Sequence, residues 1–167
     1  HKNIEIIETD FLNWDLPPKP YKVFSNIPFN MTAGIINKLL NDINPPETAY
    51  LILQDKAVQR FIGDPVARNT QMSILLKPFF EMAIAARIGR KQFVPIPKVD
   101  AVLAMFMKRK NPLIDPRSRQ LFNDFVIYGY NQWKPTILEA FEKVFSPKQR
   151  LILEKKIDIH GKKPGDL

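Results

Sequence analysis

Three segments between residues 21 and 53 constrain the fold of this chain most. Residues 21–25 form a short apolar run, and residues 32–40 repeat large aliphatic residues at the spacing of one helix face. A second, continuous apolar run at residues 50–53 is typical of a buried parallel strand. The order strand, helix, strand predicts an α/β domain, in which helices cover a mostly parallel sheet.

Flanking segments extend this pattern in both directions. Residues 4–7 alternate and are β-branched, so we expect a strand that leads into Asp10 and Phe11. Thr32 is placed to cap the helix that follows residues 21–25. Beyond residue 53 we expect helices over residues 56–62 and 69–80, then an antiparallel hairpin of strands over residues 81–88 and 99–107.

The last third of the chain has a different pattern. Basic residues and a proline at positions 108–112 are followed by helical periodicity over residues 117–130 and 134–144. Ser146 and Pro147 are typical of the cap and the first residue of a further helix. We therefore expect an α/β domain over residues 1–110 and a small all-α domain over residues 111–167.

The composition limits the classes of protein to be considered. The chain has 167 residues and 45% hydrophobic residues, and no apolar run approaches the ~20 residues of a membrane-spanning helix. It has no cysteine, which excludes disulfides, iron–sulfur clusters and thiolate zinc sites. The net charge of +8 favours a polyanionic partner, either nucleic acid or an anionic membrane surface. We expect a cytoplasmic protein with a nucleic-acid partner, no membrane partner and no metal.

The tetrapeptide Asn26-Ile27-Pro28-Phe29 lies between the expected strand at residues 21–25 and the helix at residues 32–40. In open α/β sheets ligands bind at the carboxyl ends of the strands, which places the tetrapeptide at a ligand-binding edge. An amide, a proline-fixed backbone and an aromatic ring suit a flat base that carries an exocyclic amino group. We interpret the motif as that of a nucleic-acid adenine methyltransferase. The alternative is an ordinary strand-to-helix turn, in which Asn and Pro are common.

This chemistry needs two hydrogen-bond acceptors and a stacking surface. The exocyclic amine of adenine is a poor nucleophile because its lone pair is delocalised into the ring. The Asn26 side-chain oxygen and the Ile27 carbonyl can accept the amino hydrogens, and Pro28 orients that carbonyl by fixing φ. Phe29 offers a face on which the base can stack, worth roughly 1–3 kcal/mol. Positioning the amine against an activated methyl group then contributes most of the rate.

Several motifs together resemble the ribosomal RNA adenine N6-dimethyltransferases. Asp10-Phe11, Asn26-Ile27-Pro28-Phe29-Asn30 and the segment 93–100 match landmarks of that family in order and spacing. The segment 75–81 is similar to the 23S rRNA branch, which confers macrolide–lincosamide–streptogramin resistance. Residues 97–100 are also shared with the 16S/18S-type dimethylases of ribosome biogenesis. The resemblance implies a Rossmann-like class I methyltransferase sheet followed by a helical RNA-recognition domain.

The resemblance also implies a role for each matching residue. Asp10 would hydrogen-bond the adenine amino group of S-adenosylmethionine, with Phe11 beside it. Asn26 would touch both cofactor and target, Phe29 would stack on the flipped adenine, and Phe93 would form the second aromatic wall. The residues alone leave simpler alternatives open: Asp10 as a turn or helix-cap residue, and Phe93 as a core aromatic.

The chain departs from the family at its beginning. A glycine-rich cofactor loop and an acidic ribose-binding residue are missing, and none of the six glycines forms a G-x-G cluster. We therefore expect a partial catalytic domain whose first strands are absent, so that this chain alone is inactive. The intact protein would be monomeric and would methylate the N6 amine of an adenine in ribosomal RNA. The alternatives are a 16S-type dimethylase, a non-enzymatic RNA-binding remnant and a DNA amino-methyltransferase.

The ribosomal RNA partner would be held by a positive groove and a flipped base. Such a surface predicts strong salt dependence of binding. We consider Lys98 the best candidate because it lies near the expected cleft, and Tyr130 and Trp133 are more typical of packing. The candidate phosphate contacts are Lys56, Arg60, Arg68, Lys98, Lys108, Arg109, Lys110, Arg117, Arg119, Lys134, Lys148 and Arg150.

Overall fold

The computed structural model describes residues 3–63 and 69–166, which form two compact units. The sheet unit comprises His1–Val58 and Glu81–Lys108, and the helical unit comprises Gln59–Phe80 and Arg109–Leu167. The chain passes from the sheet unit to the helical unit between Lys108 and Arg109, beside the domain boundary expected at residue 110. Residues 59–80, which we expected in the α/β domain, belong to the helical unit. The domain boundaries themselves stay a prediction.

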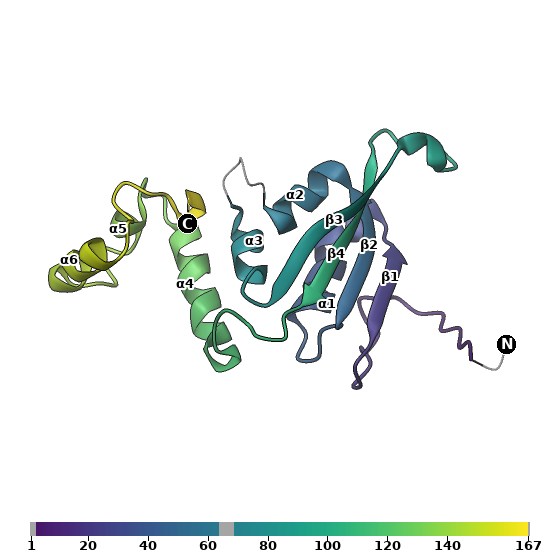
Figure 1. Ribbon diagram of the computed structural model, residues 1–167, viewed down its shortest axis with the longest axis horizontal. Coiled ribbons are helices and arrows are strands. Elements are labelled where there is room, and N and C mark those ends of the chain that lie inside the picture. The colour runs from purple at the N-terminus through teal and green to yellow at the C-terminus, as the bar shows by residue number, and fades with distance from the viewer. Residues whose placement is uncertain (1–2, 64–68, 167) are drawn as a thin grey trace. The chain divides into compact units, whose positions relative to one another are not determined.

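Four strands form the sheet in the order β1-β2-β4-β3 (Figure 1). Their bounds are Lys22–Asn26 for β1, Thr48–Gln54 for β2, Phe80–Ile88 for β3 and Ala101–Lys108 for β4. β1 pairs with β2 in parallel, as expected, with Lys22 opposite Thr48. β2 pairs with β4 in the antiparallel sense, with Thr48 opposite Met107. The sheet is therefore mixed.

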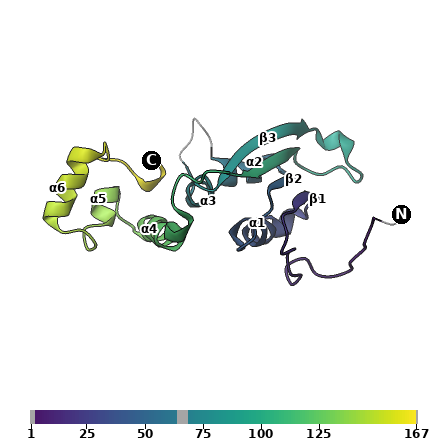
Figure 2. The same ribbon diagram turned by 60° about the horizontal axis from the view of Figure 1, so that its bottom comes forward.

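Alternation along the central strands explains where the core of the sheet unit lies. β2 buries Ala49, Leu51 and Leu53 completely and leaves the residues between them partly exposed. Helix α1, Thr32–Asn41, lies on one face of the sheet beside β1 and β2 (Figure 2). Its apolar stripe, which includes Ile36 and Leu40, is fully buried. Each such side chain contributes about 1.5–3 kcal/mol relative to an exposed one.

The helical unit is built from short helices. α2, Asp55–Ile62, begins in the sheet unit and ends in the helical unit. The others are α3 at Gln71–Leu76, α4 at Arg119–Asn131, α5 at Ile137–Ala140 and α6 at Pro147–Lys156. Four 3₁₀ turns complete the described part of the chain, η1 at Phe29–Met31, η2 at Arg90–Gln92, η3 at Pro116–Ser118 and η4 at Pro164–Asp166.

Aromatic side chains form the centre of the helical unit. The rings of Phe125 and Phe141 stack with centroids 4.2 Å apart and an interplanar angle of 14°. Phe141 also contacts Tyr128 and Phe145, and it is buried together with Ile137. Such stacked pairs contribute about 0.5–1.5 kcal/mol beyond their buried area. The stack therefore joins α4 to the short helix α5.

Two helix ends agree with the sequence prediction. Ser146 caps α6 in a capping box with Gln149, and Pro147 is the first helical residue. Gly63 follows α2 with φ of +73°, and its N–H donates to the Gln59 carbonyl at 3.0 Å. Glycine adopts this left-handed conformation without strain, which is why the helix ends there.

The strand expected at residues 4–7 is wrong. The segment has no regular structure, and Ile4, Ile6 and Ile7 are 66%, 90% and 51% exposed. A strand exists only where a neighbour completes its hydrogen bonds. Within the described residues no strand pairs with this segment, so the alternation in its sequence does not produce a strand.

Other boundaries differ from the expectation. Met31, not Thr32, is the N-cap of α1, and the Thr32 hydroxyl instead donates to the Phe29 carbonyl at 3.1 Å. The helix expected over residues 69–80 is only Gln71–Leu76, because Pro78 ends it and Phe80 already belongs to β3.

The C-terminal helices are also shorter than expected. The helix expected over residues 134–144 is only Ile137–Ala140, because Pro135 and the Thr136 cap delay its start. Trp133, expected in packing, is instead 85% exposed.

Candidate active site

The tetrapeptide Asn26-Ile27-Pro28-Phe29 forms a rigid corner between β1 and η1. Ile27 is only 4% exposed and anchors the corner in the core, while Asn26 and Pro28 are exposed and Phe29 is half-buried. The Pro28 carbonyl accepts the Met31 N–H at 3.0 Å, and the Phe29 carbonyl accepts the buried Thr32 hydroxyl. The backbone is therefore held from within, and the polar and aromatic groups remain at the surface.

A cavity of about 240 Å³ lies against this corner. Its other wall is formed by the segment between η2 and β4, which lies more than 60 residues further along the chain. Phe93 thus shares a cavity with Phe29 and Asn26. The lining residues are Asn26, Ile27, Pro28, Phe29, Phe93, Val94, Pro95 and Pro97.

Asp100 holds the segment that carries Phe93. The Asp100 carboxylate accepts the Arg90 N–H at 3.0 Å, and the Asp100 carbonyl accepts the Asp55 N–H at 3.1 Å. The Asp55 carboxylate in turn pairs with Arg87 at 3.0 Å. One residue therefore joins the start of β4 both to the turn before Phe93 and to the start of α2.

The cavity combines hydrogen-bond acceptors with aromatic walls. Within the described residues the Asn26 side chain makes no hydrogen bond, so its amide is available to a ligand. Phe29 and Phe93 are both partly exposed, as rings that stack on a ligand must be. The arrangement can accept a flat heterocycle that carries an amino group, and the individual roles stay predictions.

Asp10 and Phe11 do not line this cavity. The two carboxylate oxygens of Asp10 accept the Leu12 N–H and the Asn13 side-chain N–H, each at 3.0 Å. The Leu12 carbonyl accepts the Lys38 ammonium at 3.0 Å, which ties the turn to α1. Asp10 thus acts as a turn residue in this structure, and its part in binding a cofactor stays a prediction.

Seven of the candidate phosphate contacts are exposed. They are Lys56, Arg60, Lys98, Lys108, Lys110, Arg117 and Lys148. Lys98 directly follows Pro97, which lines the cavity. Arg68 lies outside the described residues. Lys98 is therefore the basic residue of the sheet unit that the sequence places next to the cavity wall.

Three arginines of the helical unit have contacts within the chain. The Arg109 side chain donates to the Lys77 carbonyl at 2.9 Å, and Arg117 pairs with the Asp115 carboxylate at 2.9 Å. The Arg119 guanidinium lies 4.4 Å from the centroid of the Phe79 ring, and burial lowers its pKa. These contacts fix the start of α4 and the segment before it, and RNA binding by the three residues stays a prediction.

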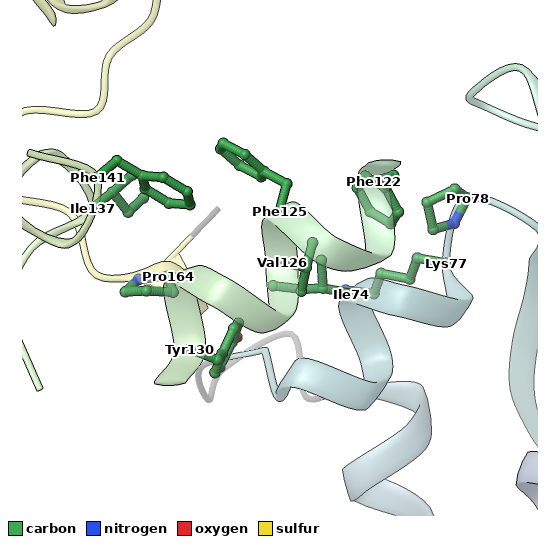
Figure 3. Close-up of a pocket in the computed structure, with 11 residues that line it drawn as sticks. Ile74, Lys77, Pro78, Phe122, Phe125, Val126, Tyr130, Ile137, Phe141 and Pro164 are labelled. Carbon is green, nitrogen blue, oxygen red and sulfur yellow. The ribbon is translucent and has the colours of Figure 1, made fainter. Parts of the chain in front are cut away.

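A second cavity, of about 290 Å³, lies among α3, α4 and α5 in the helical unit (Figure 3). Its lining is apolar apart from Lys77 and Tyr130. The Lys77 ammonium contacts the Asn69 side-chain oxygen, and the Tyr130 hydroxyl donates to the Asn69 carbonyl at 2.8 Å. Burial raises the pKa of Tyr130, and the charge of Asp166 adds to this shift. Neither polar group is free, so this cavity is poorly suited to a charged nucleotide or cofactor.

Sequence reasoning missed three residues of the first cavity. Val94, Pro95 and Pro97 line it beside Phe93. Prolines at the alternate positions 95 and 97 indicate a stiff segment. They do not indicate that this segment lies against the Asn26–Phe29 corner. In residues 3–63 and 69–166, no group of three or more potential ligands could hold a metal ion, and no helix is long and apolar enough to cross a bilayer.

Comparison with known proteins identifies the family. A sequence model described as "Ribosomal RNA adenine dimethylase" matches residues 1–164. An rRNA adenine N-6-methyltransferase of Corynebacterium diphtheriae is 33% identical over 124 residues, which cover 74% of this chain and 47% of that protein. One from Saccharopolyspora erythraea is 29% identical over 126 residues, covering 75% and 32%. A ribosomal RNA small subunit methyltransferase A of Chlorobium luteolum is 28% identical over 150 residues, covering 87% and 54%.

Solved structures agree with this result. The crystal structure of the 23S rRNA methyltransferase ErmE matches with a TM-score of 0.83 and 26% identity, over 100% of this chain and 66% of that one. A dimethyladenosine transferase from Plasmodium falciparum matches with a TM-score of 0.74 and 21% identity, over 100% and 69%. The second match supports the fold alone.

These matches confirm the Rossmann-like methyltransferase fold class that the sequence predicted. The curated relatives above are longer proteins, of which the chain spans between 32% and 54%. The family consists of rRNA adenine methyltransferases, as the Asn-Ile-Pro-Phe corner and the segment around Phe93 indicated. The chain belongs to the ribosomal RNA adenine dimethylase family.

Proposed function

We propose that this chain is the target-binding part of an enzyme that methylates the N6 amine of an adenine in ribosomal RNA. The observation that carries the proposal is the cavity in which Asn26 and Phe29 meet Phe93. The family match supports the substrate class. The exposed charge of a chain with net charge +8 supports a polyanionic partner.

The chemistry of the corner follows from its acceptors. The Asn26 side-chain oxygen and the Ile27 carbonyl accept the two amino hydrogens of the target adenine and localise the nitrogen lone pair. Phe29 and Phe93 hold the flipped base from its faces. S-adenosylmethionine, when bound, supplies an electrophilic methyl carbon for the amine. The residues therefore act by orientation and need no strong general base.

The cofactor site is only partly present in this chain. Asp10 offers a carboxylate, but both of its oxygens take part in the local turn. The sequence has no glycine-rich loop for a nucleotide cofactor. We therefore propose that the chain binds RNA but does not methylate alone, and that a segment with the glycine-rich loop completes the enzyme. The complete enzyme would be a cytoplasmic monomer.

We favour the 23S branch, and with it resistance to macrolide-type antibiotics. The match to the ErmE structure supports this choice. The Chlorobium luteolum relative supports the alternative, a 16S-type dimethylase. An RNA-binding remnant without activity is the second alternative, because this sequence has no glycine-rich loop for a nucleotide cofactor.

Methyl incorporation by the completed enzyme tests these proposals. Protein-free 23S rRNA, assembled 30S particles and duplex DNA would be offered in parallel with labelled S-adenosylmethionine. We expect transfer to 23S rRNA, whereas preference for 30S particles would favour the 16S branch. Preference for DNA would contradict both branches. Absence of transfer to every substrate, together with intact RNA binding, would favour the remnant.

Asn26→Ala tests the role of the corner. We expect transfer to fall on the order of 100-fold or more, as when a preorganised hydrogen-bonding group is removed from other active sites. Stability should change by less than about 0.5 kcal/mol, because the side chain is exposed and makes no hydrogen bond within the described residues. Asn111→Ala, at another exposed asparagine, is the matched control. Transfer that survives Asn26→Ala within a few fold would refute the assigned role.

A further inference from the structure

Trp133 is a large aromatic side chain at the surface of the helical unit. It follows the C-cap of α4, and its indole side chain is 85% exposed. The aromatic residues Phe125, Phe141 and Phe145 of the helical unit contact one another, but Trp133 takes no part in that cluster. Packing among residues 3–63 and 69–166 therefore does not account for a large aromatic side chain at this position.

A lysine is placed against the Trp133 ring. The Lys134 ammonium lies 4.7 Å from the ring centroid, within the range of a cation–π interaction. The same ammonium pairs with the Glu142 carboxylate at 3.1 Å. These two contacts hold the lysine ammonium over one face of the ring and leave the opposite face for a ligand.

The segment around Trp133 is held at both sides. The Gln132 side chain donates to the Tyr128 carbonyl of α4 at 3.3 Å. On the other side, Thr136 and Glu139 form the capping box of α5. The indole is therefore presented from a fixed segment, which lowers the entropy lost when a ligand binds to it.

The charge of this part of the chain favours an anionic ligand. Lysine and arginine outnumber aspartate and glutamate between residues 109 and 167. An exposed indole face beside a cation matches the two needs of single-stranded nucleic acid, which are a stacking surface for a base and a positive charge for the backbone. A paired duplex does not offer a free base face to such a ring.

We propose that Trp133 stacks on an unpaired base of the RNA substrate, other than the target adenine. The inference rests on the proposed function, because it assumes that the partner is RNA. It adds a binding site for a single-stranded segment, in which Lys134 attracts the backbone beside the stacked base. Such a site would make the enzyme prefer RNA with a loop or an end over a continuous duplex.

Tryptophan fluorescence can test this site directly, because the chain has two tryptophans. Trp14→Phe removes the other one, whose ring lies against Phe11 with centroids 6.2 Å apart. The full-length variant would be titrated with a single-stranded RNA and with the duplex of the same sequence, at low salt. We expect strong quenching by the single strand and little by the duplex.

Binding of the same fluorescently labelled RNA provides the second readout. Trp133→Ala should weaken binding to the single strand on the order of 5- to 100-fold, and Trp133→Phe should retain most of it. The salt dependence should stay unchanged in Trp133→Ala, because no charge is lost, whereas Lys134→Ala should reduce the slope by about 0.7.

The outcomes separate this inference from the proposed function. If RNA binds but the Trp133 fluorescence and the affinity of Trp133→Ala stay unchanged, the stacking site is wrong and the proposed function stands. If no RNA binds even at low salt, the proposed function fails as well. Quenching by vesicles of anionic phospholipid but not by RNA would overturn the inference in favour of a membrane surface.

Discussion

Asp100→Ala should loosen the wall of the candidate active site that carries Phe93. The substitution removes the carboxylate that accepts the Arg90 N–H at 3.0 Å, and it leaves the backbone bond from the Asp55 N–H intact. A hydrogen bond of this kind contributes about 1 kcal/mol when it is solvent-exposed. Local opening of the segment around η2 should therefore become about fivefold more frequent.

Native-state hydrogen exchange measures this opening residue by residue. We expect the Arg90 amide to exchange about fivefold faster in Asp100→Ala, because exchange through local opening follows the opening equilibrium. Asp100→Asn is the matched control: it keeps an oxygen acceptor and should change the rate less than about twofold. Helix α1, whose apolar stripe is buried, provides the internal reference.

Two results would refute the reasoning. An unchanged Arg90 exchange rate in Asp100→Ala would mean that the carboxylate does not anchor the segment. Equal acceleration in Asp100→Asn and Asp100→Ala would mean that the acceptor oxygen is not the cause. If the anchor is real, RNA methylation by the completed enzyme should also fall in Asp100→Ala, because Phe93 would no longer be held against the corner.

Two other predictions concern the helical unit. Gly129→Ala would place a Cβ 3.0 Å from the Phe141 ring, so overpacking of about 1–3 kcal/mol should exceed the helix-propensity gain of about 1 kcal/mol. Urea denaturation should show a lower midpoint, and a raised midpoint would mean that the adjoining cavity absorbs the ring. Asp115 has its pKa lowered by hydrogen bonds from Arg117, so its contribution to stability is present above the ordinary value of 3.8 and is lost as the pH falls through the lower folded value. Carboxyl NMR titration should find this pKa raised toward its ordinary value in Arg117→Ala, which removes the side-chain hydrogen bonds and keeps the backbone one, and an unchanged pKa would contradict the pairing.

Local sequence patterns determined the elements that are held together by contacts between residues near one another in the sequence. The strand–corner–helix order around Asn26-Ile27-Pro28-Phe29 followed from apolar spacing and from the fixed backbone of Pro28. The start of α6 followed from Ser146 and Pro147, because a cap acts on the first turn of its own helix. Resemblance then gave the family, since the motifs of this corner and of residues 93–100 keep their order and spacing.

The tertiary structure decided which distant segments meet. Residues 4–7 have the alternation of a strand, but a strand also needs a partner, and the pattern does not encode whether one is present. Trp133 is a residue of a type that usually packs against other side chains, yet no described segment covers it. Phe93 reaches the Asn26 corner only because β3 and β4 bring the segment between them to that end of the sheet. Long-range pairing and burial depend on the whole fold, whereas turns, caps and helix faces depend on neighbours within a few residues.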